Sequence, residues 1–372
     1  MSARFLTVVL ERAFNMRDGF GREIDYMRIS VIDSCNLNCY YCNPCDNNEH
    51  CHALNILSVK EVLCIVRAAT RLGIKHFRLT GGEPLLHPQL DEMVLQIKKI
   101  SGVSSVSLTT NAVLLAQHAK WLKEAGIDSI NVSLDTIDAS EYEHITKKPL
   151  LHKVEQGIDA AIECGIRVKI NVVLTPQTDV VALTRYASKK GTDIRFIEMM
   201  PVGEGHTNGV KPYEKVIGAL LEVYGTSCHI DTENREEINS GYNNADNGPA
   251  EYYSFHGLDI RVGLIQAIYG KFCDTCNRIR VTADGRLMPC LGSSVTMDLV
   301  PDSWDFADDA EKDFSIVRAL RAAIKAKPRC HNFNDNAVTY TKTTETKTVE
   351  TKATELKAAE VNAARNMSRI GG

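Results

Sequence analysis

Short runs of apolar and β-branched residues recur along the first half of the chain, and each has the length and composition of a β-strand. The runs are MRISVI (27–32), HFRLT (76–80), SVSLTT (105–110), SINVSLD (129–135), RVKINVVLT (167–175) and DIRFIEMM (193–200). A glycine precedes each run after the first, at Gly73, Gly102, Gly126, Gly165 and Gly191. Because a glycine after a helix supplies a left-handed stop, the pattern predicts a repeated unit of helix, glycine and strand.

The stretch 58–72 shows the helical part of this unit. Ser58 and Glu61 have the spacing of a capping box at a helix N-terminus. Apolar residues then share one helical face, at Val59, Val62, Leu63, Val66 and Ala69. Alternating strands and helices predict an α/β protein with a parallel sheet, either open or curled into a barrel.

Six such strands, with chemistry-bearing loops after their carboxyl ends, favour an incomplete (βα)6 TIM-type barrel. A Rossmann-type sheet is the alternative. Gly81 and Gly82 follow a strand, but no G-x-G-x-x-G motif opens a helix here, which argues against dinucleotide binding.

The pattern changes after residue 200, where Pro and Gly residues interrupt the repeat. A helix is predicted at 212–224 and an exposed loop at 231–250. Two apolar runs, RIRVT (278–282) and RLMPCL (286–291), then flank Ala283-Asp284-Gly285, which predicts a β-hairpin. The segment 341–361 is low in complexity and rich in Thr, Lys and Glu.

These changes predict four segments. We expect an N-terminal extension at 1–17 and a partial barrel at 18–200. A smaller C-terminal domain is expected at 201–335, followed at 336–372 by a low-complexity tether that ends in a Gly-Gly tail. The length of the chain is sufficient for one large and one smaller domain.

Composition favours a cytoplasmic enzyme. The chain has 372 residues, of which 44% are apolar, and a net charge of -4, which gives no electrostatic case for nucleic-acid binding. The apolar run at 5–10 is too short for a signal peptide, and no window could span a membrane bilayer. Twelve cysteines in such a chain favour metal ligation over disulfides.

Six of these cysteines form two triads. Cys35, Cys39 and Cys42 lie in CNLNCYYC, whereas Cys273, Cys276 and Cys290 lie in CDTCNRIRVTADGRLMPC. Thiolates at such spacings converge on a soft metal or an iron–sulfur cluster, and a cluster held by three thiolates leaves one iron free to bind a ligand. Two halves of a zinc ribbon are the alternative, but structural zinc prefers four ligands, commonly as two short-spaced pairs.

The predicted hairpin brings Cys290 back toward Cys276 and places Arg278 and Arg280 on one face of a strand. Two guanidinium groups beside a cluster suit a phosphate or carboxylate ligand. A pair of exposed strand arginines is the alternative.

The remaining cysteines give weaker signals. Cys64 and Cys164 have the positions of packed helical residues, and Cys228 and Cys330 lack partners at ligand spacing. Cys45 and Cys51 lie close to the first triad in sequence, so a metal or redox role for them stays open.

Taken together, the motifs resemble those of the molybdenum cofactor biosynthesis protein A family. The resemblance rests on CNLNCYYC, GGEP (81–84), INVSLD (130–135), VKINVV (168–173), RFIEMM (195–200), the second triad with its arginines, and the terminal Gly371-Gly372. It runs from about residue 18 to 330 and resumes at the last six residues. The family consists of radical S-adenosylmethionine (radical SAM) enzymes with lyase-type GTP 3',8-cyclase activity.

The resemblance implies a partial barrel whose open side is covered by the C-terminal domain. The first triad would hold a 4Fe-4S cluster that binds S-adenosylmethionine, and the second triad would hold another 4Fe-4S cluster that binds the guanine of GTP. The positions that would contact S-adenosylmethionine are Tyr41, Gly82, Ser133 and Met200. The positions that would contact GTP are Arg28, Arg78, Thr109, Lys169, Arg278 and Arg280.

The implied reaction converts GTP to (8S)-3',8-cyclo-7,8-dihydroguanosine 5'-triphosphate, the first step of molybdenum cofactor (molybdopterin) biosynthesis. A 5'-deoxyadenosyl radical would remove H3' of the ribose, and the C3' radical would attack C8 of the guanine. The expected catalytic residues are Arg278, Arg280, Gly371 and Gly372. The two glycines are included because they can enter a space too narrow for a side chain. Expected partners are an external one-electron reductant, a downstream pterin-forming synthase that takes the product, and a possible second copy in a homodimer.

Three departures from the family pattern and two other interpretations remain. Ser34 stands where the family usually has arginine, Ala112 replaces the glycine of its TNG motif, and the low-complexity tail at 341–361 is longer than expected. A peptide-modifying radical SAM enzyme would share both triads but should lack Arg278, Arg280 and the Gly-Gly terminus. A non-enzymatic electron carrier or zinc-stabilised binding module would explain the cysteines but not GGEP and the repeated units.

Overall fold

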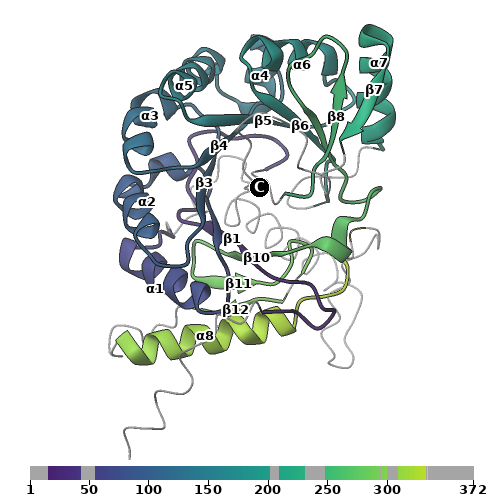
Figure 1. Cartoon of the computed structure of the whole chain (residues 1–372). Helices are drawn as coiled ribbons and strands as arrows, with labels where there is room; N and C mark the ends of the chain where they lie inside the picture. The colour runs from purple at the N-terminus through teal and green to yellow at the C-terminus, as the bar shows by residue number, and fades with distance from the viewer. Residues whose placement is uncertain are drawn as a thin grey trace, which may run out of the picture.

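A curved sheet of parallel strands forms the centre of the molecule, with helices on its outer side (Figure 1). The computed structural model describes residues 16–42, 55–201, 209–230, 248–293, 295–299, 309–331 and 333. Several sequence predictions fall outside these residues: those on Cys45, Cys51, most of the loop at 231–250, the segment 341–361 and Gly371-Gly372.

The six predicted strands are present and pair in parallel in chain order. They are β1 (Tyr26–Ser30), β2 (His76–Thr80), β3 (Ser105–Thr110), β4 (Ser129–Ser133), β5 (Arg167–Val173) and β6 (Asp193–Ile197). The five predicted glycine stops all have positive φ, between 65° and 91°. The repeated unit of helix, glycine and strand is therefore confirmed.

Helices connect these strands on the outer side of the sheet (Figure 1). They are α1 (Val59–Thr70), η1 (Pro84–Leu86), α2 (Leu90–Lys98), α3 (Leu115–Glu124), α4 (Ala139–Thr146), α5 (Leu151–Glu163) and α6 (Val180–Lys189). The predicted capping box opens α1, because the Glu61 N–H donates to Ser58 Oγ at 3.3 Å and the Ser58 N–H donates to Glu61 Oε2 at 2.7 Å.

The segment after residue 200 adds strands to both edges of the six-stranded sheet. β9 (Val262–Ile265) pairs in parallel with β6, and β10 (Arg278–Val281) pairs in parallel with β1. Antiparallel strands extend the two edges further: β7 (Ser227–Ile230), β8 (Glu251–Phe255), β11 (Arg286–Met288) and β12 (Met297–Asp298). The sheet thus continues across the boundary near residue 200, and the domain division stays a prediction.

Helical elements complete the C-terminal part. The helix predicted at 212–224 consists of a π-helical turn, η2 (Tyr213–Ile217), that continues as α7 (Gly218–Tyr224). The 3-10 turn η3 (Phe272–Thr275) carries Cys273. α8 (Asp309–Lys325) lies along β11 and β12 and packs against α1, to which Asp313 is linked by an ion pair with Arg71 at 2.7 Å (Figure 1).

Alternation of side chains along the strands separates the core from the interior of the barrel. In β2, Phe77 and Leu79 are fully buried in the apolar core, whereas Arg78 between them faces the cavity. The same alternation places Arg28 of β1 toward the cavity between the buried Met27 and Ile29. Parallel strands covered by helices therefore position polar side chains only toward the barrel interior.

Ala112 holds the backbone conformation that glycine favours. Its φ is 63°, and in the described part of the chain only two other non-glycine residues have positive φ. This conformation costs an L-residue roughly 1–2 kcal/mol, and a glycine would avoid that cost. The greater chain entropy of glycine in the unfolded state offsets part of this gain. We expect Ala112→Gly to stabilise the protein by about 0.5–1 kcal/mol, measured by urea unfolding.

Ala125 provides the control for this experiment. It caps α3 with a right-handed φ of -70°, so Ala125→Gly should destabilise the protein. A lower unfolding free energy for Ala112→Gly would contradict the strain argument.

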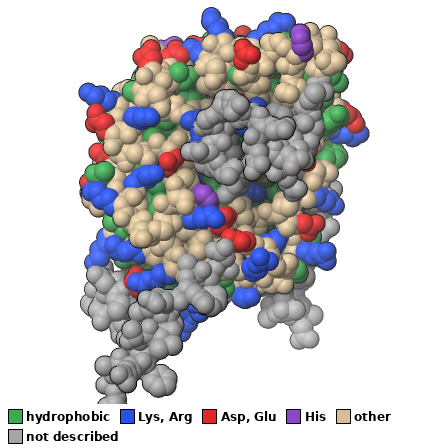
Figure 2. Space-filling model, viewed as in Figure 1, with side chains coloured by type: hydrophobic (Ala, Val, Ile, Leu, Met, Phe, Trp, Pro, Cys, Tyr) green, Lys and Arg blue, Asp and Glu red, His purple; other side chains and the backbone are tan. Residues whose placement is uncertain are grey.

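Acidic and basic side chains are interspersed on the face shown in Figure 2, in keeping with the net charge of -4. Within the described residues, no helix is both long enough and apolar enough to cross a membrane.

Candidate active site

A cavity of about 280 Å³ lies at the carboxyl ends of the parallel strands. Both cysteine triads line it: Cys35, Cys39 and Cys42 from the loop after β1, and Cys273, Cys276 and Cys290 from the segments around β10 and β11. Two motifs that are distant in sequence therefore meet at one site.

The GGEP motif holds the loop that carries the first triad. The Gly82 N–H donates to Ile32 O at 2.7 Å, and the Glu83 N–H donates to Ser34 O at 2.8 Å. A Cβ at Gly82 would lie 2.2 Å from Ser34 O, so only glycine fits at this distance from the loop. These contacts fix the backbone immediately before Cys35.

Asp135 fixes the other side of the first triad. The Tyr41 hydroxyl donates to Asp135 Oδ2 at 2.5 Å, and the Val173 N–H donates to Oδ1 at 2.8 Å. Burial, with the negative charge of Asp135, raises the pKa of Cys42 to about 11. Cys35 is exposed toward the cavity, and desolvation by the protein around it raises the pKa of its thiol to about 12. A positively charged metal would compensate the negative charge of thiolates that burial and Asp135 disfavour.

The second triad is assembled from segments that are tied together. The Cys276 N–H donates to Cys273 O at 3.1 Å. Arg22, from the chain before β1, donates to the same carbonyl at 2.6 Å, and Asp18 holds its guanidinium at 2.6 Å. Cys290 follows β11, which the confirmed hairpin places beside β10.

Cations surround the second triad. Burial alone would raise the pKa of Cys276, but the nearby charges of Arg278 and Lys327 lower it to about 6. Arg278 Nη2 lies 3.9 Å from Cys276 Sγ. The two triads thus differ in electrostatics, with a carboxylate beside the first and cations beside the second.

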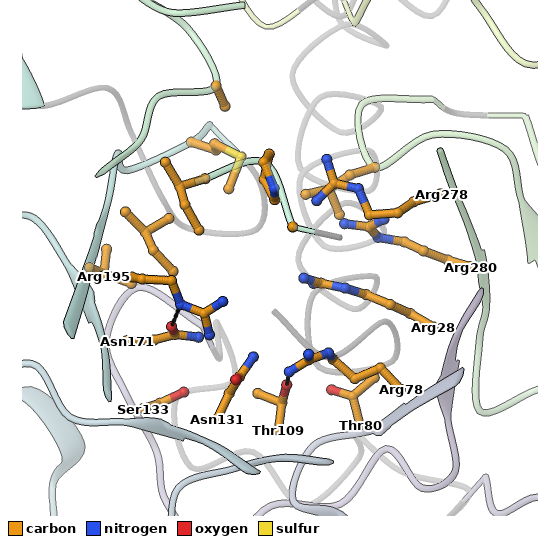
Figure 3. Close-up of a pocket in the computed structure, with 18 of the residues that line it drawn as sticks. Arg28, Arg78, Thr80, Thr109, Asn131, Ser133, Asn171, Arg195, Arg278 and Arg280 are labelled. Atoms are coloured by element: carbon orange, nitrogen blue, oxygen red, sulfur yellow. Dashed lines mark hydrogen bonds between the residues drawn. The ribbon is translucent and has the colours of Figure 1, made fainter. Parts of the chain in front are cut away.

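Arginines project into the cavity from both walls (Figure 3). Arg28, Arg78, Arg278 and Arg280 come from β1, β2 and β10, while Arg195 faces them from β6. The cavity is lined by six Lys or Arg side chains and two Asp or Glu side chains among the described residues. This excess of cations suits an anionic ligand.

Several guanidinium N–H groups in the two walls of the cavity are available to a ligand. Within the described part of the chain, Arg28 Nε, Arg278 Nε, Arg280 Nε and Arg195 Nη2 are buried without a hydrogen-bond partner. Burial and the nearby arginines lower the pKa of Arg28 well below its ordinary value. Because buried polar groups are normally hydrogen-bonded, this cluster has the properties of a binding site for an anion.

The cavity contains most of the predicted binding residues. The predicted S-adenosylmethionine positions Tyr41, Gly82, Ser133 and Met200 line it, as do the predicted GTP positions Arg28, Arg78, Thr109, Arg278 and Arg280. Lys169 does not line it. This lysine is 2% exposed within β5, where its backbone pairs with Asn131 of β4 and Asp193 of β6. Gly371 and Gly372 lie outside the described residues.

Other lining residues escaped the sequence analysis. Arg195 lies between the buried Ile194 and Phe196 and donates to Asn171 Oδ1 at 2.9 Å. Its pattern matches that of Arg78 in HFRLT, so the same alternation could have identified it. Lys327 carries no local signal of this kind. Burial is the main cause of the raised pKa of Cys273, and the nearby Cys290, Cys276 and Cys330 add to it, although Cys330 does not line the cavity.

Each triad supplies three thiolates, one fewer than the four ligands of a structural zinc site. Among the described residues, no group of three or more His, Cys, Asp or Glu side chains is arranged to hold a metal ion. Zinc requires its four ligands around one centre, whereas the thiolates of a 4Fe-4S cluster each bind a different iron and remain further apart.

Comparison with known proteins defines the class. The Radical SAM superfamily model matches residues 29–183, and the Molybdenum Cofactor Synthesis C model matches residues 192–333. The fold is similar to that of Streptococcus suis SuiB bound to S-adenosylmethionine, with a TM-score of 0.52 and 15% identity over 80% of this chain and 68% of that chain. The chain is a radical SAM protein, which implies a 4Fe-4S cluster and S-adenosylmethionine.

Curated relatives define the family within this class. The chain is 35% identical to the GTP 3',8-cyclase of Clostridium perfringens over 322 residues, covering 86% of this chain and 95% of the relative. It is 38% identical to the GTP 3',8-cyclase of Moorella thermoacetica over 326 residues, covering 86% and 96%. The chain belongs to the GTP 3',8-cyclase family.

Proposed function

We propose that this chain converts GTP to (8S)-3',8-cyclo-7,8-dihydroguanosine 5'-triphosphate, in the first step of molybdenum cofactor biosynthesis. The supporting observation is that two cysteine triads and five inward-pointing arginines meet in one cavity. A radical SAM centre requires only the first triad. The second triad and the arginines therefore point to a bound substrate that has both a metal-binding base and negative charge.

The first triad would hold the cluster of the radical reaction. Cys35, Cys39 and Cys42 would be its ligands, and the residues around S-adenosylmethionine would be Tyr41, Gly82, Ser133 and Met200. When bound, this pair supplies a 5'-deoxyadenosyl radical. The chain itself fixes the loop through Gly82 and orients Tyr41 through Asp135.

GTP would be held at both ends. Cys273, Cys276 and Cys290 would carry a second 4Fe-4S cluster at the guanine end, while Arg28, Arg278 and Arg280 offer free guanidinium N–H groups to the triphosphate. Arg78 is oriented by Tyr26 and by Thr109 at 3.5 Å. Fixing a substrate at two ends restricts which ribose hydrogen meets the radical, and the enclosing barrel excludes water.

One experiment separates this function from its alternatives. Reconstituted protein is incubated without oxygen with S-adenosylmethionine, dithionite and GTP, and the products are identified by mass spectrometry. A cyclase yields 5'-deoxyadenosine together with a cyclised nucleotide. A peptide-modifying enzyme leaves GTP unaltered, and an electron carrier or zinc module yields no 5'-deoxyadenosine.

Lys169 gives the proposal a pH-dependent test. Burial, with the charges of Arg195 and Arg167, lowers its pKa to about 6, so at about pH 7.5 the amine is mostly neutral. A triphosphate nearby would raise this pKa again. GTP binding at about pH 7.5 should therefore cause Lys169 to take up a proton. At about pH 5.5, where Lys169 is already mostly charged before the nucleotide binds, it should not.

Calorimetry of GTP binding in buffers of different ionisation enthalpy measures this uptake. Lys169→Met should abolish its share of the uptake, whereas Lys98→Met, which removes an outer ion pair with Asp128, should not. Equal proton uptake by Lys169→Met and the parent protein would show that Lys169 does not respond to the nucleotide.

The remaining expectations belong to the same proposal. We propose a cytoplasmic enzyme whose region 201–335 supplies the second cluster and GTP contacts. An external one-electron reductant and a downstream pterin-forming synthase would be its partners. The roles of Gly371 and Gly372, which lie outside the described residues, stay predictions. The formation of a homodimer also stays a prediction.

A further inference from the structure

Lys327 joins two of the segments that carry the second triad. It lies just after α8 and is 3% exposed. Its Nζ donates to Arg278 O at 2.8 Å and to Pro289 O at 2.9 Å. Arg278 lies two residues after Cys276, and Pro289 directly precedes Cys290. One buried ammonium group thus ties together the backbones on which Cys276 and Cys290 are placed.

The residues next to Lys327 reach the third cysteine. Arg22 donates to Pro328 O at 2.6 Å and to Arg329 O at 2.9 Å, and the same guanidinium donates to Cys273 O at 2.6 Å. The segment 327–329 is therefore linked to all three cysteine-bearing segments of the second triad.

The charge of Lys327 is directed at the thiols. Lys327 lines the cavity, and no carboxylate in the described part of the chain forms an ion pair with it. Burial lowers its pKa, and the charges of Cys276 and Cys290, together with a hydrogen bond to Cys276, oppose that shift. Backbone carbonyls orient an ammonium group without neutralising it, so its field acts on these sulfurs.

We propose that Lys327 is a positioning residue of the second triad, which holds the Cys276 and Cys290 segments together and raises the reduction potential of the cluster they bind. The proposal rests on the proposed function, because it requires a cluster at the second triad. A positive charge beside a cluster stabilises its reduced, more negative state.

The test isolates the second cluster. The triple variant C35A/C39A/C42A serves as the parent, so that its iron and its electron paramagnetic resonance signal come from the second triad alone. Lys327→Met is added to this parent, and the midpoint potential of the cluster is measured by an anaerobic redox titration. We expect a shift to more negative potential in Lys327→Met, and a potential closer to that of the parent in Lys327→Arg, which keeps the charge.

Lys123 supplies the matched control. Its Nζ also donates to a backbone carbonyl, that of Gly165 at 2.6 Å, but it lies on α3 and does not line the cavity. Lys123→Met should leave the potential and the resonance signal of the second cluster unchanged.

The outcomes are distinct. An unchanged potential and signal in Lys327→Met would overturn the proposal. If Lys327→Met prevents cluster assembly, retention of iron by Lys327→Arg would support it, and equal loss of iron in both variants would overturn the role of the charge. A triple-variant parent that binds no iron would contradict the proposed function itself.

Discussion

Replacing Cys273, Cys276 and Cys290 together with alanine is expected to abolish cyclisation of GTP while cleavage of S-adenosylmethionine continues. Because each triad would hold its own 4Fe-4S cluster, the reconstituted protein should contain about eight irons per chain, and this variant about four. Iron analysis, 5'-deoxyadenosine formation and nucleotide products are measured on the same preparation.

Cysteines outside the triads provide the control. Cys64 is buried in α1 and Cys164 caps α5, so replacing both with alanine should leave the iron content and both reactions intact. Zinc at the second triad in place of iron, or continued formation of cyclised nucleotide by the triple variant, would contradict the account.

The second large effect is expected at Arg278 and Arg280. Each guanidinium lies in the wall of the cavity with a buried N–H that has no partner among the described residues. Loss of a charged hydrogen bond costs roughly 1.5–3 kcal/mol, so alanine at either position should lower kcat/KM for GTP by about 10- to 100-fold. Iron content should remain that of the parent protein.

Arg286 is the matched control on the same hairpin. Its side chain is 52% exposed on β11, and it does not line the cavity, so Arg286→Ala should retain GTP turnover. Normal turnover in both Arg278→Ala and Arg280→Ala would reduce these residues to a structural role.

Local patterns predicted the repeated part of the fold. The six strands, the positive φ of the glycines before them and the capping box of α1 depend on neighbours within a few residues, which the sequence displays directly. The hairpin at 278–291 belongs to the same category, because its register follows from Ala283-Asp284-Gly285.

Long-range pairing was not predictable in this way. β9 and β10 join opposite edges of the sheet, and nothing within either run identifies its partner strand. The contacts of Arg22 with Cys273 O and Lys327 with Arg278 O use backbone carbonyls, which every residue possesses, across 251 and 49 positions. A residue that accepts a hydrogen bond through its backbone carbonyl therefore cannot be recognised from its side chain in the sequence.

The alternation of side chains predicts which charged residues face the barrel interior, but not which of them reach the cavity. A charged residue between buried apolar neighbours in a parallel barrel faces the interior, as Arg78 does. Lys169 follows the same rule and is buried, yet it does not line the cavity, because facing inward does not specify depth along the strand. Ala112 shows a further limit, because the sequence reveals its departure from the TNG motif but not its φ of 63°.

The fate of one hydrogen shows whether the radical acts on C3' of GTP. GTP that carries deuterium at C3' of the ribose is incubated without oxygen with the reconstituted protein, S-adenosylmethionine and dithionite, and 5'-deoxyadenosine is analysed by mass spectrometry. We predict that 5'-deoxyadenosine gains deuterium in step with the formation of cyclised nucleotide. Formation of 5'-deoxyadenosine without deuterium, with GTP recovered unchanged, would contradict it.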